Sequence, residues 1–223
     1  MDLPRFRHPF ASIISGPTGS GKTNWLFNFI KNITILVDKP PDRIVYFYFH
    51  WQKAFEDISD RVCFIKGPPE DLESLAREGG ADSSKLFIID DCMSEMGGKA
   101  GDGMTTMFSR GCHHLNTSLI VVAQNIFYKG QRTSRINCHY IILMKSVGDK
   151  LQAMSLARQL YPGVHQFFLQ AYRDATQEPF TYLVIDLHML TQEKMRLRTN
   201  IFPQEWPIVV YCPSAETAAK VFK

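Results

Sequence analysis

A glycine-rich stretch near the N-terminus constrains this chain more than any other feature: Gly16-Pro17-Thr18-Gly19-Ser20-Gly21-Lys22-Thr23. It matches the pattern G-x-x-x-x-G-K-S/T, in which backbone N–H groups surround a phosphate group. Glycines permit the backbone angles that turn those N–H groups inward. Lys22 supplies a positive charge for the β- and γ-phosphates, and the Thr23 hydroxyl is a ligand for Mg²⁺. The stretch, called the phosphate loop below, predicts a site for ATP and Mg²⁺.

The segments on both sides of the phosphate loop agree with this interpretation. Residues 10–14 form a short apolar run of strand length. After the loop, apolar side chains recur at helical spacing at Trp25, Leu26, Phe29 and Ile30. A helix that begins near Lys22 directs its positive dipole end toward the bound phosphates.

Apolar segments of strand length alternate with helical segments along the rest of the chain. The expected strands cover residues 43–49, 62–65, 85–91, 118–124, 139–144, 180–186 and 208–211, and the expected helices cover 51–58, 70–77, 104–114, 149–160 and 164–175. Such alternation is typical of a parallel sheet with helices on both faces. We therefore predict an α/β fold with a mostly parallel central sheet. The helix over 149–160 is expected to bury Leu151, Met154, Ala157 and Leu160.

Length and composition limit the domain organisation and the location. We assign residues 1–205 to one P-loop domain and residues 206–223 to a tail that packs on it or extends from it. No apolar run approaches the roughly 18 residues that cross a bilayer, and the N-terminus lacks an apolar signal region. The five cysteines form no C-x-x-C pair. These features predict a soluble, intracellular protein without a transmembrane segment.

Two carboxylates, Asp90 and Asp91, end the apolar run over residues 85–89. Ligands of parallel sheets bind beyond the carboxyl ends of the strands, so this pair is expected beside the phosphate loop. Asp90 is expected to hold Mg²⁺ together with Thr23. Asp91 is expected to accept a proton from the water that attacks the γ-phosphate. The alternative interpretation of the pair is an acidic cluster at the start of a loop.

Gln124 ends the next apolar strand, which we expect to lie between the strand of the phosphate loop and the strand of Asp90. An amide at this place can contact both the γ-phosphate and the attacking water, which makes Gln124 a candidate sensor. The alternative is a solvent-exposed residue at a strand end.

A basic loop is expected after Gln124, with Lys129, Arg132 and Arg135. An arginine from a neighbouring subunit often neutralises transition-state charge on the γ-phosphate, and Arg132 is our candidate for that role. Arg110 is a weaker one. The same basic side chains could instead follow a nucleic-acid backbone or form a solvent-exposed turn.

These motifs together resemble a known group of proteins. The phosphate loop, Ile88-Ile89-Asp90-Asp91 and Val122-Ala123-Gln124-Asn125 occur in the order and spacing of the FtsK–HerA superfamily. Within it, the chain most resembles the genome-packaging ATPases of double-stranded DNA viruses, the poxvirus-like type included, and of Polinton/Maverick-type elements. Residues 111–114, 132–133, 137–140 and 196–203 carry this closer resemblance, which covers about residues 8–205.

The resemblance implies a RecA-like ATPase that assembles into a homo-oligomeric ring, a pentamer or hexamer, and packages double-stranded DNA into a viral capsid. In the family pattern Thr23 and Asp90 hold Mg²⁺, Asp91 is the catalytic carboxylate, Gln124 the sensor and Arg132 the arginine acting in trans. Many relatives have glutamate where this chain has Asp91. The implied partners are DNA, further copies of the chain and capsid vertex proteins, in the host cytoplasm or nucleus or in the virion.

Other classes of P-loop protein fit the sequence less well. A nucleotide kinase should have an arginine-rich lid, whereas residues 97–103 contain one lysine and no arginine. A regulatory GTPase should contain N-K-x-D, yet no asparagine in the chain is followed by lysine. A DNA-binding protein with a relic loop would have no need for Lys22, Asp90 and Gln124.

Overall fold

The apolar segments that were predicted to be strands form one continuous sheet in the computed structural model, which describes residues 4–80, 82–90, 103–127 and 132–214. The sheet order is β3-β2-β4-β5-β1-β6-β7-β8-β9. The strands are β1 (Ala11–Ser15), β2 (Arg43–Tyr48), β3 (Val62–Lys66), β4 (Lys85–Asp90), β5 (Thr117–Ala123), β6 (Tyr140–Met144), β7 (Tyr182–Asp186), β8 (Leu197–Thr199) and β9 (Val209–Val210).

Strands β1 to β6 pair in parallel, and β7, β8 and β9 extend the sheet in antiparallel fashion. The predicted α/β fold with a mostly parallel sheet is confirmed. β5 lies between β1 and β4, as we expected for the strand that ends at Gln124. The register pairs Ser15 with Ala123 and Asp90 with Val122, so the carboxyl ends of β1, β4 and β5 lie at nearly the same level.

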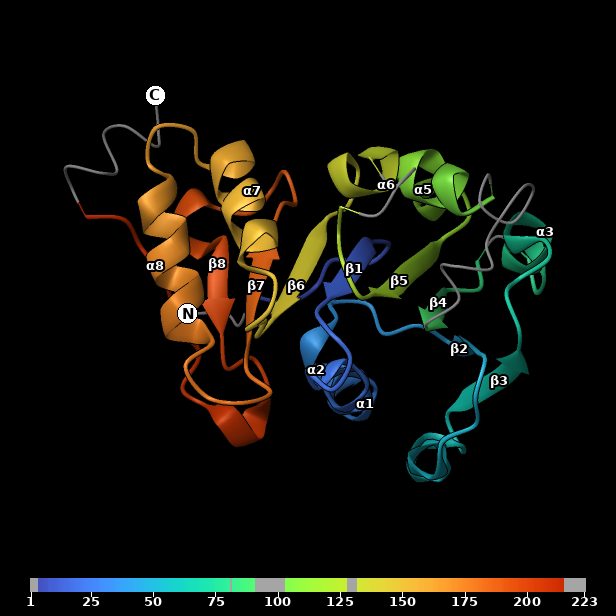
Figure 1. Cartoon of the computed structure of the whole chain (residues 1–223). Coiled ribbons are helices and arrows are strands. Elements are labelled where there is room, and N and C mark those ends of the chain that lie inside the picture. Colours follow the sequence, from blue (N-terminus) through green and yellow to red (C-terminus); the bar gives the residue numbers. More distant parts are fainter. Residues whose placement is uncertain (1–3, 81, 91–102, 128–131, 215–223) are drawn as a thin grey trace.

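Helices cover both faces of the sheet (Figure 1). On one face lie α1 (Lys22–Lys31), α2 (Ile33–Leu36) and the 3₁₀ segment η1 (Lys53–Ile58). On the other lie α3 (Leu72–Arg77), the π-helical segment η2 (Met107–Gly111), α5 (Cys112–His114), α6 (Arg132–Ile136), α7 (Lys150–Leu160) and α8 (His165–Ala175). Two short 3₁₀ segments, η3 (Glu193–Met195) and η4 (Pro203–Glu205), flank β8. No helix of the described ranges combines the length and the apolar character that a bilayer span requires.

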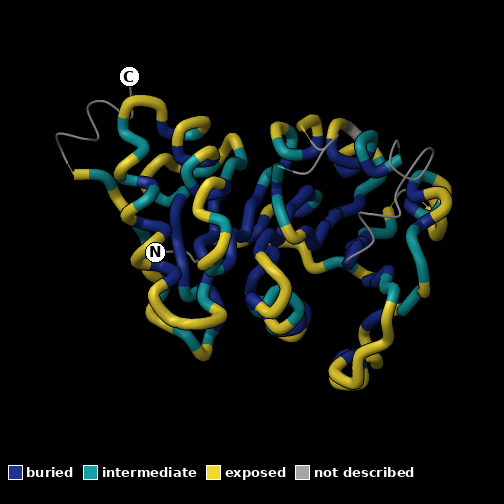
Figure 2. Tube along the Cα trace, viewed as in Figure 1, coloured by how far each residue is buried: buried dark blue, intermediate teal, exposed yellow. Residues whose placement is uncertain are grey.

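The core consists of two apolar layers, one on each face of the sheet. Successive strand residues point to opposite faces, so Ile13 and Val121 join one layer while Ile14 and Val122 join the other. The inner strands β1, β4, β5, β6, β7 and β8 are buried along their length, whereas the edge strands β3 and β9 carry exposed residues. Most other exposed residues lie on the outer surfaces of the helices and in the connections (Figure 2). This burial explains why the parallel strands are continuous apolar runs rather than alternating ones.

The buried face of α7 differs from our prediction. Leu151 is 71% exposed, and the buried residues of the helix are Gln152, Ala153, Leu156 and Ala157. Gln152 is satisfied in the core because its Oε1 accepts hydrogen bonds from Ser15 Oγ (2.6 Å) and the Ile126 N–H (2.7 Å).

The predicted basic loop is wrong at its second half, because residues 132–136 form helix α6. Asp91 and Lys129 lie outside the described residues. Helix α2 and strand β8 were not predicted, because their four and three residues are too short to show a clear hydrophobic period. In the tail, β9 pairs with β8, and the Tyr211 hydroxyl donates to Asp174 on α8 (2.7 Å).

Candidate active site

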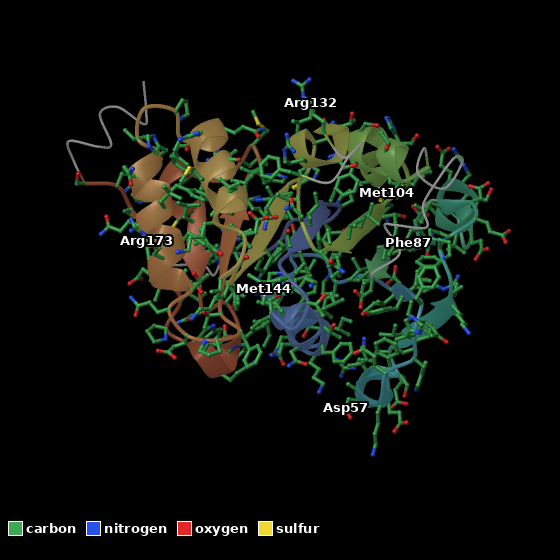
Figure 3. All side chains as sticks on the ribbon, in the orientation of Figure 1. Asp57, Phe87, Met104, Arg132, Met144 and Arg173 are labelled. Atoms are coloured by element: carbon green, nitrogen blue, oxygen red, sulfur yellow. The ribbon has the colours of Figure 1, made fainter. Side chains whose placement is uncertain are left out.

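The phosphate loop connects β1 to α1, as its motif predicts. Gly19 and Gly21 have φ angles of 78° and 96°, in the left-handed region that favours glycine. Gly16 is required for a different reason: a Cβ at this position would lie 2.7 Å from Met144 Cβ and 2.7 Å from Ser20 Oγ. Figure 3 places Met144 at the centre of the sheet, where β6 ends beside the loop.

The Lys22 ammonium group lies over the phosphate loop. Its Nζ donates hydrogen bonds to the carbonyl oxygens of Gly16 (2.7 Å) and Pro17 (2.9 Å). Helix α1 begins at Lys22, and the first N–H groups of a helix have no partner within it. The loop therefore combines a cation with the positive end of a helix dipole.

A pocket of about 330 Å³ opens over the phosphate loop. It is lined by Thr18, Gly19, Gly21, Lys22, Thr23, Asn24, Gln52, Asp90, Gln124 and Phe180. The structure thus brings three separately predicted elements, the loop, Asp90 and Gln124, to one place. We call this space the loop pocket.

Asp90 is the last residue of β4 and is only 8% exposed. The hydroxyl of Tyr46, a fully buried residue of the neighbouring strand β2, donates a hydrogen bond of 2.5 Å to Asp90 Oδ2. A hydrogen bond to an ionised carboxylate is strong, so Tyr46 holds the carboxylate in one orientation. In the sequence, Tyr46 is one residue of the strand expected over 43–49, with nothing to mark it as part of the site. Only the pairing of β2 with β4 reveals its contact with Asp90.

Thr23 and Asp90 fit a magnesium ion by the chemistry of their side chains. Both line the loop pocket, and both offer oxygen atoms, the ligands that Mg²⁺ prefers. Mg²⁺ characteristically takes few protein ligands and completes its shell with water and substrate phosphates. One hydroxyl and one carboxylate beside a phosphate loop are such a set.

Gln124 is exposed and lies just beyond β5, at the rim of the loop pocket. The two residues after Gln124 are fixed by hydrogen bonds to α7 and its N-cap. Asn125 Nδ2 donates to Asp149 Oδ2 (2.7 Å), and the Ile126 N–H donates to Gln152. Because Gln152 also binds Ser15, the residue before the phosphate loop, it ties both segments together. Sequence reasoning missed Gln152, since a glutamine in an amphipathic helix is usually exposed.

The two arginines of α6 have different surroundings. Arg132 is exposed, and its side chain projects from α6 away from the sheet (Figure 3). It does not line the loop pocket. Arg135 lies with its guanidinium 4.3 Å from the centre of the Phe127 ring, and partial burial lowers its pKa. Arg132 therefore remains the side chain of this pair that is available to another molecule.

Comparison with known proteins gives matches only among solved structures. No protein-family model and no curated protein matches the sequence. The genome packaging NTPase B204 from Sulfolobus turreted icosahedral virus 2, in complex with sulfate, matches with a TM-score of 0.60 at 10% identity, over 93% of this chain and 98% of that chain. This chain has the fold of a viral genome-packaging NTPase. The resemblance to that group predicted from the sequence is thus confirmed in the fold.

Two further structures support the same fold. B204 in complex with ATP-γ-S matches with a TM-score of 0.55 at 14% identity, over 92% of this chain and 97% of that chain. The cytoplasmic domain of the type VII secretion ATPase EccC from Thermomonospora curvata matches with a TM-score of 0.53 at 15% identity. That match covers 90% of this chain and 25% of EccC.

Proposed function

We propose that this chain is an ATPase that drives double-stranded DNA into a viral capsid. The observation that carries the proposal is the loop pocket, in which Lys22, Thr23, Asp90 and Gln124 converge on a loop whose backbone can cradle phosphate. In this proposal Lys22 binds the phosphates, Thr23 and Asp90 coordinate the metal ion, and Gln124 senses the γ-phosphate. The genome-packaging role is supported by the shared fold and by the sequence phrases that resemble that family.

Phosphate binding in this proposal begins with an exchange of hydrogen bonds at Lys22. The ammonium group donates to Gly16 and Pro17 carbonyls, which are uncharged acceptors. Triphosphate oxygens are charged and form stronger hydrogen bonds with the same donor. Lys22 would therefore turn from the loop carbonyls to the β- and γ-phosphates, and the N–H groups at the start of α1 would complete the contacts.

Hydrolysis in this proposal uses the ends of β4 and β5. Thr23 and Asp90 would hold Mg²⁺, which when bound neutralises charge on the β- and γ-phosphates. Tyr46 would keep Asp90 in place during this process. Asp91 would accept the proton of the attacking water, and Gln124 would orient that water against the γ-phosphate.

Coupling to DNA would require several copies of the chain in a ring. Arg132 is exposed and projects outward, as an arginine that reaches a neighbouring subunit's nucleotide must do. Mixing tests this role: Arg132→Ala subunits combined with Lys22→Ala subunits should recover part of the ATPase activity, because each supplies what the other lacks. Normal assembly without any recovery would contradict the trans role of Arg132.

The proposed ATPase activity is tested by substituting two lysines at the ends of the same helix. Lys22→Ala should reduce Mg²⁺-dependent ATP hydrolysis at least 100-fold, since it removes the phosphate-binding charge. Lys31→Ala is the matched control, because Lys31 ends α1 in an exposed ion pair with Asp57. Equal hydrolysis by both variants would contradict the proposed active site.

A further inference from the structure

Phe180 is an apolar side chain at the edge of the loop pocket, and neither the fold nor the proposed chemistry accounts for it. It is 63% exposed although it is a large aromatic residue. Its ring lies against the phosphate loop: a Cβ built on Gly21 would come within 3.1 Å of Phe180 Cβ and 3.2 Å of its Cδ1. Gly21, Lys22 and Thr23 line the loop pocket together with it.

The backbone of Phe180 has an unfavourable conformation. Its φ angle is 64°, in the left-handed region that a bulky side chain rarely adopts. Hydrogen bonds hold the turn in this shape: Thr181 Oγ1 donates to the Glu178 carbonyl (2.6 Å), and the Lys145 N–H donates to the Thr181 carbonyl (3.1 Å). Lys145 Nζ also donates to the carbonyl of Gln177. Disfavoured backbone conformations that neighbouring bonds enforce are concentrated at ligand-binding sites.

Phe180 also lies on a particular side of the phosphate loop. It precedes β7, which is separated from β1 by β6. On the other side of β1, Asp90 ends β4 and Gln124 follows β5. β7 runs antiparallel to β6, with Tyr182 opposite Met144, so its first residue lies at the edge of the sheet that carries the phosphate loop. A triphosphate with its γ-phosphate toward Asp90 and Gln124 would therefore extend its nucleoside toward Phe180.

We propose that Phe180 is the platform on which the base of the nucleoside triphosphate stacks. This inference rests on the proposed ATPase function and specifies how its substrate is bound. Every base presents a flat π-face, so an aromatic side chain adds affinity without selecting one base. The contact is expected to serve ATP and GTP alike. Phe180 then has a reason to stay exposed, because its ring is covered only when nucleotide binds.

Binding measurements with and without a base test this proposal. Titration calorimetry in Mg²⁺ buffer compares ATP, GTP and inorganic tripolyphosphate on the unaltered chain and on Phe180→Ala. The Kd for ATP and for GTP should rise about tenfold, within the range measured for a lost stacking contact. The Kd for tripolyphosphate should change less than twofold. Met189→Ala is the matched control, because Met189 is 89% exposed and follows the far end of β7.

A tryptophan at the same position supplies an independent readout. Phe180→Trp should bind ATP as tightly as the unaltered chain, and its fluorescence should change with ATP but not with tripolyphosphate. The proposal is overturned if Phe180→Ala weakens ATP and tripolyphosphate equally, because Phe180 would then only support Gly21. Unchanged ATP affinity in Phe180→Ala overturns it as well. If the unaltered chain binds ATP no better than Lys22→Ala does, the proposed function fails together with the base contact.

Discussion

The strands on the two sides of β1 place different kinds of side chain next to the phosphate loop. On one side, called the parallel side below, lie β5 and β4, which both pair in parallel; Asp90 ends β4, Gln124 follows β5, and a buried tyrosine hydroxyl holds Asp90. The other side is called the antiparallel side below, because the strands beyond β6 pair in antiparallel fashion. There β6 contributes Met144 next to Gly16, and the turn before β7 contributes the exposed ring of Phe180. We infer a division of function, in which the parallel side performs the proposed phosphate chemistry and the antiparallel side provides the proposed base contact and stability.

The largest effect is expected from Asp91→Asn on the parallel side. This change removes the proposed proton acceptor, and general-base catalysis typically contributes about 10²- to 10⁴-fold to the rate. Steady-state kinetics should show kcat reduced by that range, and calorimetry should show ATP binding retained. A kcat within a few-fold of that of the unaltered chain would assign the proton transfer to another group.

The next largest effect concerns stability on the antiparallel side. Arg198 of β8 is fully buried, and its Nη1 donates to Asp186 Oδ2 of β7 (2.8 Å). Arg198→Ala leaves Asp186 buried without its partner, which should lower the free energy of unfolding in urea by about 3–5 kcal/mol. Arg77→Ala, which breaks an exposed ion pair with Glu73, is the control and should cost less than about 1 kcal/mol. Similar losses in the two variants would show that the buried pair contributes little.

A smaller effect is expected when the Tyr46 hydroxyl is removed. Tyr46→Phe leaves Asp90 less firmly oriented, so hydrolysis should need more Mg²⁺ and kcat should fall about tenfold, as for loss of one hydrogen bond to a charged group. Tyr140→Phe is the matched control, since its buried hydroxyl accepts the Arg7 N–H. Measuring the ATPase rate of each variant as a function of Mg²⁺ concentration tests whether Tyr46 supports the metal site. An unchanged magnesium requirement in Tyr46→Phe would make Tyr46 a structural residue only.

The smallest change in energy is expected at Phe180, and it should have opposite effects on stability and affinity. Glycine tolerates a positive φ, so Phe180→Gly should raise the free energy of unfolding by about 1 kcal/mol. The same change should raise the KM for ATP about tenfold with kcat preserved, if KM follows binding. Thermal unfolding and steady-state kinetics on one preparation test both. A loss of kcat without a rise in KM would contradict the assignment of substrate affinity, rather than chemistry, to Phe180.

The sequence predicted the parallel side well because each of its functional residues follows an apolar run. Asp90 and Gln124 could be found because such runs mark buried strands, and parallel strands share one carboxyl edge. Lys22 could be found because the phosphate loop that contains it has a recognisable pattern. The contact between Tyr46 and Asp90 could not be predicted, since it depends on which strand lies next to β4. The structure places Lys22, Asp90 and Gln124 at one pocket. Their roles, like those of Asp91 and Arg132, stay predictions.

On the antiparallel side, the sequence pattern predicted the structure less well. Phe180 was assigned to the start of a strand because it is apolar and precedes one, whereas its positive φ places it in a turn. The predicted buried face of α7 was wrong because Gln152, although polar, is buried and hydrogen-bonded in the core. Arg198 lies in a phrase that carried the family resemblance, and the structure shows a buried ion-pairing role for it. Polar groups that are satisfied by distant partners leave no period in the sequence.

One measurement decides whether the loop pocket belongs to an ATPase that moves DNA. This is the rate of Mg²⁺-dependent ATP hydrolysis by the unaltered chain, with and without duplex DNA, at several protein and salt concentrations. We expect the rate per subunit to rise with protein concentration and to rise further when DNA is added, and we expect the DNA effect to weaken as the salt concentration increases. An ATPase rate that is the same with and without DNA at every salt and protein concentration would contradict the proposed function.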